Sequence, residues 1–137
     1  MVGILIVAHG AFGEALIHCA SHVLGRRPLR VRQLGVTVHD DPDAILPQAQ
    51  DLVRQLDEGD GVLVLTDMIG ATPSNIAARL SVAGKVEVVG GVSLPMLIRA
   101  LTYRAQPLTV VVEKAVSGGR EGVAHLGGSE AHAATRG

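Results

Sequence analysis

Two side chains that can do nucleophilic or acid–base chemistry follow two separate runs of apolar residues. His9 follows the run Gly3–Ala8, and Asp67 follows the run Val62–Thr66. An imidazole that is held through one ring nitrogen by a carboxylate keeps its other nitrogen free to attack. Such a pair can handle a phosphoryl group, provided that the fold brings the ends of the two runs together.

The elements that must position this pair are strands that alternate with helices. Short β-branched runs predict the strands, while Pro near the starts and Gly after the ends mark the helices between them. The predicted strands are Gly3–Ala8, Val31–Val36, Val62–Thr66 and Val86–Gly91, and the predicted helices are Phe12–Leu24, a segment near Pro42–Leu56, Pro73–Val82 and Pro95–Tyr103. This order predicts an α/β fold, a doubly wound three-layer α/β/α domain with a four-stranded parallel sheet.

The carboxyl ends of the strands are the expected position of a site in such a sheet. Ligands bind there at the point where the connections depart in opposite directions. If the first and third strands are neighbours, His9 and Gly10 lie beside Asp67 at that point. The pairing with Asp67 favours a functional histidine over a merely structural one.

The segment after Asp67, "DMIGATPSNIAARL", adds a candidate anion site. Thr72 is predicted to cap a helix and Pro73 to occupy its first position. The N–H groups of Ser74 and Asn75 would then be free to bind a phosphate or carboxylate. Alone, such a motif indicates only a good helix start, but here it follows Asp67 and would face His9.

The composition excludes several classes of protein. The chain has 137 residues, enough for one domain, and its core must be aliphatic because it has one Phe, one Tyr and no Trp. A formal net charge of −1 argues against a generic nucleic-acid binder. No apolar run has the length of a membrane span, and no leader segment is evident at the N-terminus. The single cysteine, Cys19, fits a reducing cytoplasm.

Two groups of possible metal ligands lie outside this site. His18 and His22 are four residues apart in a predicted helix, a spacing able to bind metal, but without further ligands we interpret them as an exposed helix face. The acidic stretch His39–Asp43 is better explained by Asp41 as a helix cap and Pro42 as the first helical residue.

Four motifs in order resemble the IIA component of the mannose-type phosphoenolpyruvate-dependent sugar phosphotransferase system. They are "VAHGAFGEAL", "VLVLTDMIGATPSNIAARL", "VVGGVSLPMLIRAL" and "AVSGGREGVAHL". The resemblance implies that His9 is the phosphorylated histidine, that Asp67 orients it and that Thr72 contacts the phosphoryl group. It implies a phosphotransferase that needs no cofactor or metal. Where some members carry bulky aromatic residues beside the histidine, this chain has Ala11 and Ile69.

The resemblance also implies partners. The small phosphocarrier HPr, charged from phosphoenolpyruvate through enzyme I, would be the donor. Because the chain ends without a linker and a IIB domain, we expect the acceptor to be a separate IIB component or a regulatory target.

The C-terminal region is ambiguous from its residues alone. The run "LTVVVEKAV" after Pro107 suits either a strand or a buried helix. The resemblance favours the helix and assigns a short strand, about Gly122–Leu126, that is exchanged in a homodimer. The expected domain is 1–127, and residues 128–137 are expected to form a flexible tail.

Three other functions remain open at this point. The phosphotransfer subunit of dihydroxyacetone kinase shares the fold and chemistry but serves another acceptor. A tetrapyrrole metal chelatase also begins with a strand that ends in His-Gly, but it needs a second histidine at a later strand end, where this chain has Asp67 or Gly90-Gly91. A regulatory module whose phosphorylation state is read by a partner is compatible with the phosphocarrier.

Overall fold

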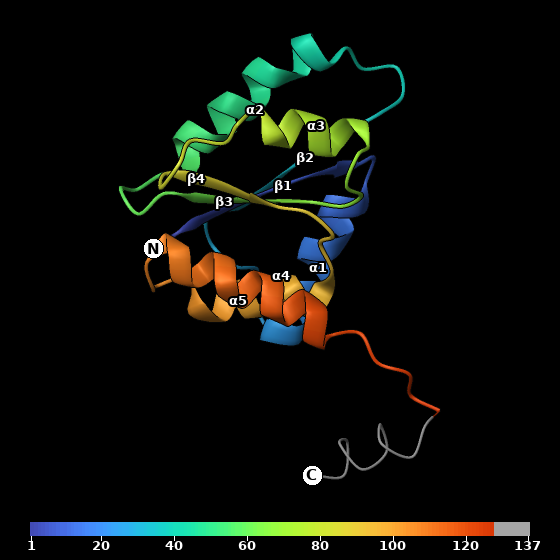
Figure 1. The fold of residues 1–137 in the computed structure, drawn as a ribbon, viewed down its shortest axis with the longest axis vertical. Helices are drawn as coiled ribbons and strands as arrows, with labels where there is room; N and C mark the ends of the chain where they lie inside the picture. Colours follow the sequence, from blue (N-terminus) through green and yellow to red (C-terminus); the bar gives the residue numbers. More distant parts are fainter. Residues whose placement is uncertain (128–137) are drawn as a thin grey trace.

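A four-stranded parallel sheet lies between two layers of helices in the computed structural model, which describes residues 1–127 (Figure 1). Its strands are β1 (Gly3–His9), β2 (Val31–Val36), β3 (Val62–Thr66) and β4 (Val86–Val89). Its helices are α1 (Phe12–Leu24), α2 (Pro42–Leu56), α3 (Thr72–Ala78), α4 (Leu94–Tyr103) and α5 (Leu108–Glu121). The predicted fold class is confirmed, whereas the predicted tail 128–137 lies outside the described residues.

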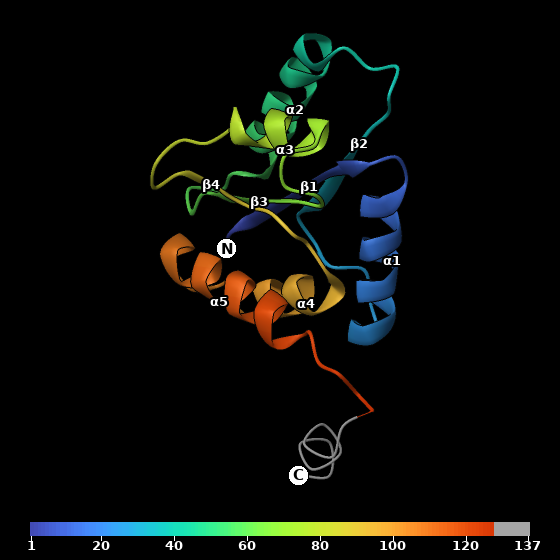
Figure 2. The same ribbon diagram turned by 45° about the vertical axis from the view of Figure 1, so that its right-hand side comes forward.

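The core is aliphatic and lies on both faces of the sheet. Alternate residues of β1 point to opposite faces, so that Ile4 and Ile6 pack with α1, α4 and α5, while Leu5 and Val7 pack with α2 and α3. Figures 1 and 2 show this division of the helices into two layers. These four side chains are fully buried, and each such burial contributes about 1.5–3 kcal/mol.

The order of the strands, β2-β1-β3-β4, makes β1 and β3 neighbours. In their parallel register Val7 lies opposite Thr66. The residues that follow these two positions therefore reach the same carboxyl edge of the sheet. The predicted meeting point of the first and third strands is confirmed.

Several predicted boundaries are wrong by a few residues. β4 ends at Val89 rather than Gly91, and α3 ends at Ala78 rather than Val82. The shorter helix has a local cause, because Val82 and Val86 exchange backbone hydrogen bonds of 3.0 and 2.8 Å in a tight turn. Those bonds hold Val82 in a β-bridge with Val86, so Val82 cannot be part of the helix.

The ambiguous run after Pro107 is helical and forms α5, which packs against α4. Residues 123–125 after it have no regular structure, and both views show this part of the chain leading away from the layers (Figures 1 and 2). Val123 and Leu126 are 81% and 69% exposed there. The strand Gly122–Leu126 and its exchange in a homodimer stay a prediction, since they require a second chain.

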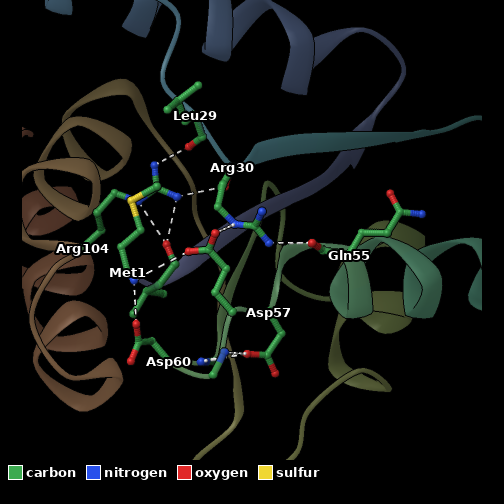
Figure 3. A network of polar contacts seen from close by, with 11 residues as sticks. Met1, Leu29, Arg30, Gln55, Asp57, Asp60 and Arg104 are labelled. Atoms are coloured by element: carbon green, nitrogen blue, oxygen red, sulfur yellow. Dashed lines mark hydrogen bonds and ion pairs between the residues drawn. The ribbon is translucent and has the colours of Figure 1, made fainter.

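The amino edge of the sheet is held together by Arg104, which caps the C-terminus of α4 and is only 8% exposed. Its guanidinium group donates to the backbone carbonyls of Val2, Leu29 and Arg30 at 2.6–3.0 Å. Figure 3 shows these contacts, with Met1 beside the guanidinium group. One side chain thus ties the starts of β1 and β2 to the end of α4.

In the part of the chain that the structure describes, none of the helices combines the length and the apolar character that crossing a membrane requires.

Candidate active site

The side chains of His9 and Asp67 meet at the carboxyl edge of the sheet. Nδ1 of His9 lies 2.7 Å from Oδ2 of Asp67, and the backbone N–H of His9 donates to the same oxygen at 3.0 Å. The His9 side chain is 48% exposed, but that of Asp67 is only 15% exposed. The carboxylate thus holds the imidazole from the protein side, while the ring itself stays accessible.

Asp67 is held in its ionised form by its hydrogen bonds. Burial alone would raise the pKa of Asp67, but hydrogen bonds from the backbone and ring of His9 and from the N–H of Met68 outweigh it and lower that pKa below its ordinary value of 3.8. The Met68 N–H donates to Oδ1 at 2.8 Å. Because an ionised carboxylate can only accept, we assign the proton of the neutral His9 ring to Nδ1. Nε2 then carries a free lone pair.

Gly35 in β2 makes room for the turn after His9, a role that the sequence pattern did not predict. Gly10 has a positive φ of 50°, and its N–H donates to the Val36 carbonyl at 3.0 Å. Its own carbonyl packs so closely on β2 that a Cβ on Gly35 would lie 2.2 Å from the oxygen. Gly35 is thus needed for space alone. A glycine inside a strand is the available signal for such a close backbone approach.

The start of α3 differs from the prediction by one residue. Ala71, not Thr72, is the N-cap residue, and Pro73 is the second helical residue. The Ser74 hydroxyl accepts from the Gly70 N–H at 2.9 Å and donates to the Ala71 carbonyl at 2.8 Å. This pair of bonds fixes the turn and starts the helix earlier than a Thr72 cap would.

One of the two N–H groups predicted to be free is occupied. The Asn75 N–H donates to the Ala71 carbonyl at 3.0 Å, because the helix begins earlier than expected. The N–H groups of Thr72 and Ser74 lie in the first turn, where a helix offers no acceptor of its own. Thr72 and Asn75 are exposed and Ser74 is half-buried. Thr72 and Ser74 are therefore the better candidates for contacting an anion through their backbone.

The loops around His9 form a rim of exposed apolar side chains. We define this apolar rim by Phe12, Val38, Met68 and Ile69, which are 42%, 92%, 61% and 79% exposed. Pro95 is exposed as well, but Met96 is 4% exposed and belongs to the core.

The acidic stretch His39–Asp43 serves as a helix start. The Asp41 side chain accepts from the Asp43 N–H at 3.0 Å and caps α2, while Asp40 accepts from the Thr37 N–H at 2.8 Å. Within residues 1–127, His, Cys, Asp and Glu form no group of three or more that could hold a metal ion. Asp67 and Gly90 follow β3 and β4, the later strand ends at which a chelatase would need its second histidine.

The fold and this pair of residues define a doubly wound α/β protein with an oriented, accessible imidazole at its switch point. The model of the EIIA-man family, described as "PTS system fructose IIA component", matches residues 3–116. The chain therefore belongs to this mannose-type IIA family of the phosphotransferase system.

Individual relatives agree with this assignment. The chain is 32% identical over 128 residues to the "PTS system mannose-specific EIIAB component" of Escherichia coli K12, an alignment that covers 91% of this chain and 39% of that protein. It is 28% identical over 103 residues to the "Transcriptional regulatory protein LevR" of Bacillus subtilis, covering 73% of this chain and 11% of LevR. The chain thus spans less than half the length of these relatives.

A solved structure has the same fold. The phosphotransferase system component EIIA from Streptococcus agalactiae superposes with a TM-score of 0.82 at 26% identity, covering 93% of this chain and 98% of that one.

Proposed function

We propose that this protein is a phosphocarrier that accepts a phosphoryl group on Nε2 of His9 and passes it to another protein in a sugar phosphotransferase system. The observation that carries the proposal is the 2.7 Å contact between Nδ1 of His9 and the largely buried carboxylate of Asp67. An ionised carboxylate at Nδ1 supports the ring tautomer that leaves Nε2 unprotonated. Membership in the mannose-type IIA family supports the same chemistry.

The transfer would proceed by in-line displacement between two ring nitrogens. The lone pair of Nε2 attacks the phosphorus of the donor phosphohistidine, the N–P bond of the donor breaks, and its electron pair returns to the donor ring. Positive charge grows on the His9 ring as the new bond forms. Asp67 stabilises this charge while it keeps the proton on Nδ1.

Backbone groups at the start of α3 would stabilise the oxygens of the transferring group. The N–H groups of Thr72 and Ser74 are the candidates, with Gly10 and the side chains of Thr72 and Asn75 close to the same edge. Donors that are already fixed in place cost no reorganisation at the moment of transfer. Ser74 contributes in a second way, because its hydroxyl bonds hold the turn that places these groups.

The expected donor is the phosphocarrier HPr, and the expected acceptor is a IIB-type protein or a regulatory target. The character of the carboxyl edge supports a protein partner. The loops at residues 10–11, 37–41, 67–71 and 90–93 contain no Lys or Arg, but they carry Asp40, Asp41 and Asp67. With the apolar rim, they suit a partner surface that is apolar at its centre and basic around it.

A regulatory acceptor is the second candidate, because LevR, named as a transcriptional regulator, contains a segment similar to this chain. The chemistry at His9 would be the same in both cases. We expect the protein to act in the cytoplasm, in keeping with its single cysteine, and to form a homodimer through Gly122–Leu126.

The proposal is tested by phosphorylating the protein with phosphoenolpyruvate, enzyme I and HPr. One phosphoryl group per chain should be incorporated, and it should be acid-labile and alkali-stable, as a phosphoramidate is. His9→Ala should abolish the labelling, whereas His39→Ala, on a neighbouring loop, should retain it. Full labelling of the His9→Ala variant would place the acceptor elsewhere.

A further inference from the structure

Two histidine rings lie in contact on the exposed face of α1, away from the active-site edge. The ring centroids of His18 and His22 are 5.6 Å apart, and the ring planes are nearly perpendicular, at 85°. Both residues are exposed. Their separation is close to the pitch of an α-helix, about 5.4 Å, as expected for side chains one turn apart. Both rings can therefore direct a nitrogen toward one common point without changing the helix.

The backbone that carries the two rings is fixed. Leu16, Ile17 and Ala20 of α1 are buried in the core, and Gly25 ends the helix in the left-handed conformation. The Ser21 hydroxyl, which lines the same hollow as the two rings, is occupied because it donates to the Ile17 carbonyl at 2.7 Å. A ligand that binds both rings would thus meet a fixed helical backbone.

The neighbouring side chains limit the site to two protein ligands. Glu14 lies one turn before His18, but its carboxylate is paired with Arg27 at 3.0 and 3.4 Å. Cys19 is exposed and lies three residues before His22, a spacing at which two side chains can meet. It is adjacent to His18, however, and adjacent helix positions do not face each other, so Cys19 cannot join the pair that His18 and His22 form. Arg26 lines the same hollow as the two histidines, so its positive charge would weaken the binding of a cation.

The sequence alone favours an exposed helix face for these two residues, but the ring geometry adds a reason to revise that interpretation. We propose that His18 and His22 chelate one divalent transition-metal ion, with water in the remaining coordination positions. Imidazole nitrogens suit Ni²⁺, Cu²⁺ and Zn²⁺, and the general order of affinity places Cu²⁺ above the other two. The site is separate from the transfer chemistry at His9, and its existence does not depend on the proposed function.

The experiment is a calorimetric titration of the full chain with Ni²⁺, which avoids the oxidation of Cys19 that Cu²⁺ could cause. We expect one ion per chain, with affinity reduced by roughly tenfold or more in either His18→Gln or His22→Gln, since each variant loses the chelate. His39→Gln, which removes an isolated exposed histidine, and Cys19→Ser should both bind as the wild type does. Unchanged affinity in both helix variants, or loss of binding in Cys19→Ser, would overturn the proposal.

Paramagnetic broadening in NMR spectra gives an independent readout. Small amounts of Ni²⁺ should broaden the ring resonances of His18 and His22 before those of His9 and His39. Phosphorylation by HPr should proceed at the wild-type rate in His18→Gln and His22→Gln. Broadening that begins at His9 instead would assign the ion to the active site and contradict a site on α1.

Discussion

The two edges of the sheet hold their charged groups in opposite ways. At the amino edge, the Arg104 guanidinium is buried and donates to three backbone carbonyls. At the carboxyl edge, the Asp67 carboxylate is largely buried, but the His9 ring that it holds is half exposed. The guanidinium group of Arg104 is enclosed by backbone carbonyls, so its role is to stabilise the structure. An oriented ring with one open nitrogen can react with another molecule.

The pKa directions reflect this difference. Burial lowers the pKa of Arg104, the nearby charge of Arg30 lowers it further, and Glu58 opposes both. Burial acts against the ionised form of Asp67 as well, but there the donors outweigh it. At the amino edge, burial therefore disfavours the charged form of Arg104. At the carboxyl edge, hydrogen-bond donors offset the burial of Asp67 and keep its carboxylate ionised beside His9.

The largest effect on stability is expected at the amino edge. Arg104→Met should leave the carbonyls of Val2, Leu29 and Arg30 without their donor and lower the free energy of unfolding by about 3 kcal/mol. Urea denaturation measures this loss. Arg99→Met, which breaks the more exposed pair with Glu121, should cost less than about 1 kcal/mol. Equal losses in the two variants would contradict the larger structural role assigned to the buried guanidinium group of Arg104.

The carboxyl edge should respond in activity rather than stability. In Asp67→Asn the amide loses the negative charge and can select the wrong ring tautomer of His9, so phosphoryl transfer from HPr should slow by roughly tenfold or more. Stopped-flow or quenched-flow labelling measures the rate. Asp40→Asn, on a neighbouring loop and bonded to Thr37 rather than His9, is the matched control. A wild-type rate in Asp67→Asn would reduce Asp67 to a structural role.

The C-terminal segment tests whether the open edge at β4 is covered by a second chain. Edge strands expose unpaired backbone groups that proteins normally protect. Removing the chain after Gly122, which leaves α5 intact, should therefore weaken self-association in sedimentation experiments and lower the melting temperature. Removing only residues 128–137 should change neither. Full-length protein that is monomeric at micromolar concentration would rule out the exchanged strand.

The smallest expected effect is the pH dependence that Asp67 confers on stability. Its pKa is lower in the folded state than in the unfolded state, so its contribution is fully present above the ordinary value of 3.8 and is lost as the pH falls below it. The difference in unfolding free energy between wild type and Asp67→Asn should shrink in that range. A difference that grows on acidification would contradict the lowered pKa.

How far the sequence predicted this structure depends on whether the signal is local. The strand runs and the Asp41 cap depend on neighbouring residues, and both were predicted correctly apart from the end residues of β1 and β4. The meeting of His9 and Asp67 followed from the parallel order of the strands. The close packing of Gly35 on Gly10 was missed because it joins backbone groups that only the fold brings together. The early start of α3 was missed because the Ser74 hydroxyl, rather than Thr72, fixes the turn.

The central claim is that Asp67 directs the phosphoryl group to one nitrogen of one histidine. NMR of protein that carries ¹⁵N-labelled histidine, phosphorylated through HPr, tests it most directly, because coupling between ³¹P and ¹⁵N identifies the bonded nitrogen. The account predicts a single phosphohistidine with phosphorus on Nε2 of His9 and the proton still on Nδ1. Phosphorus on Nδ1, or on a residue other than His9, would contradict it.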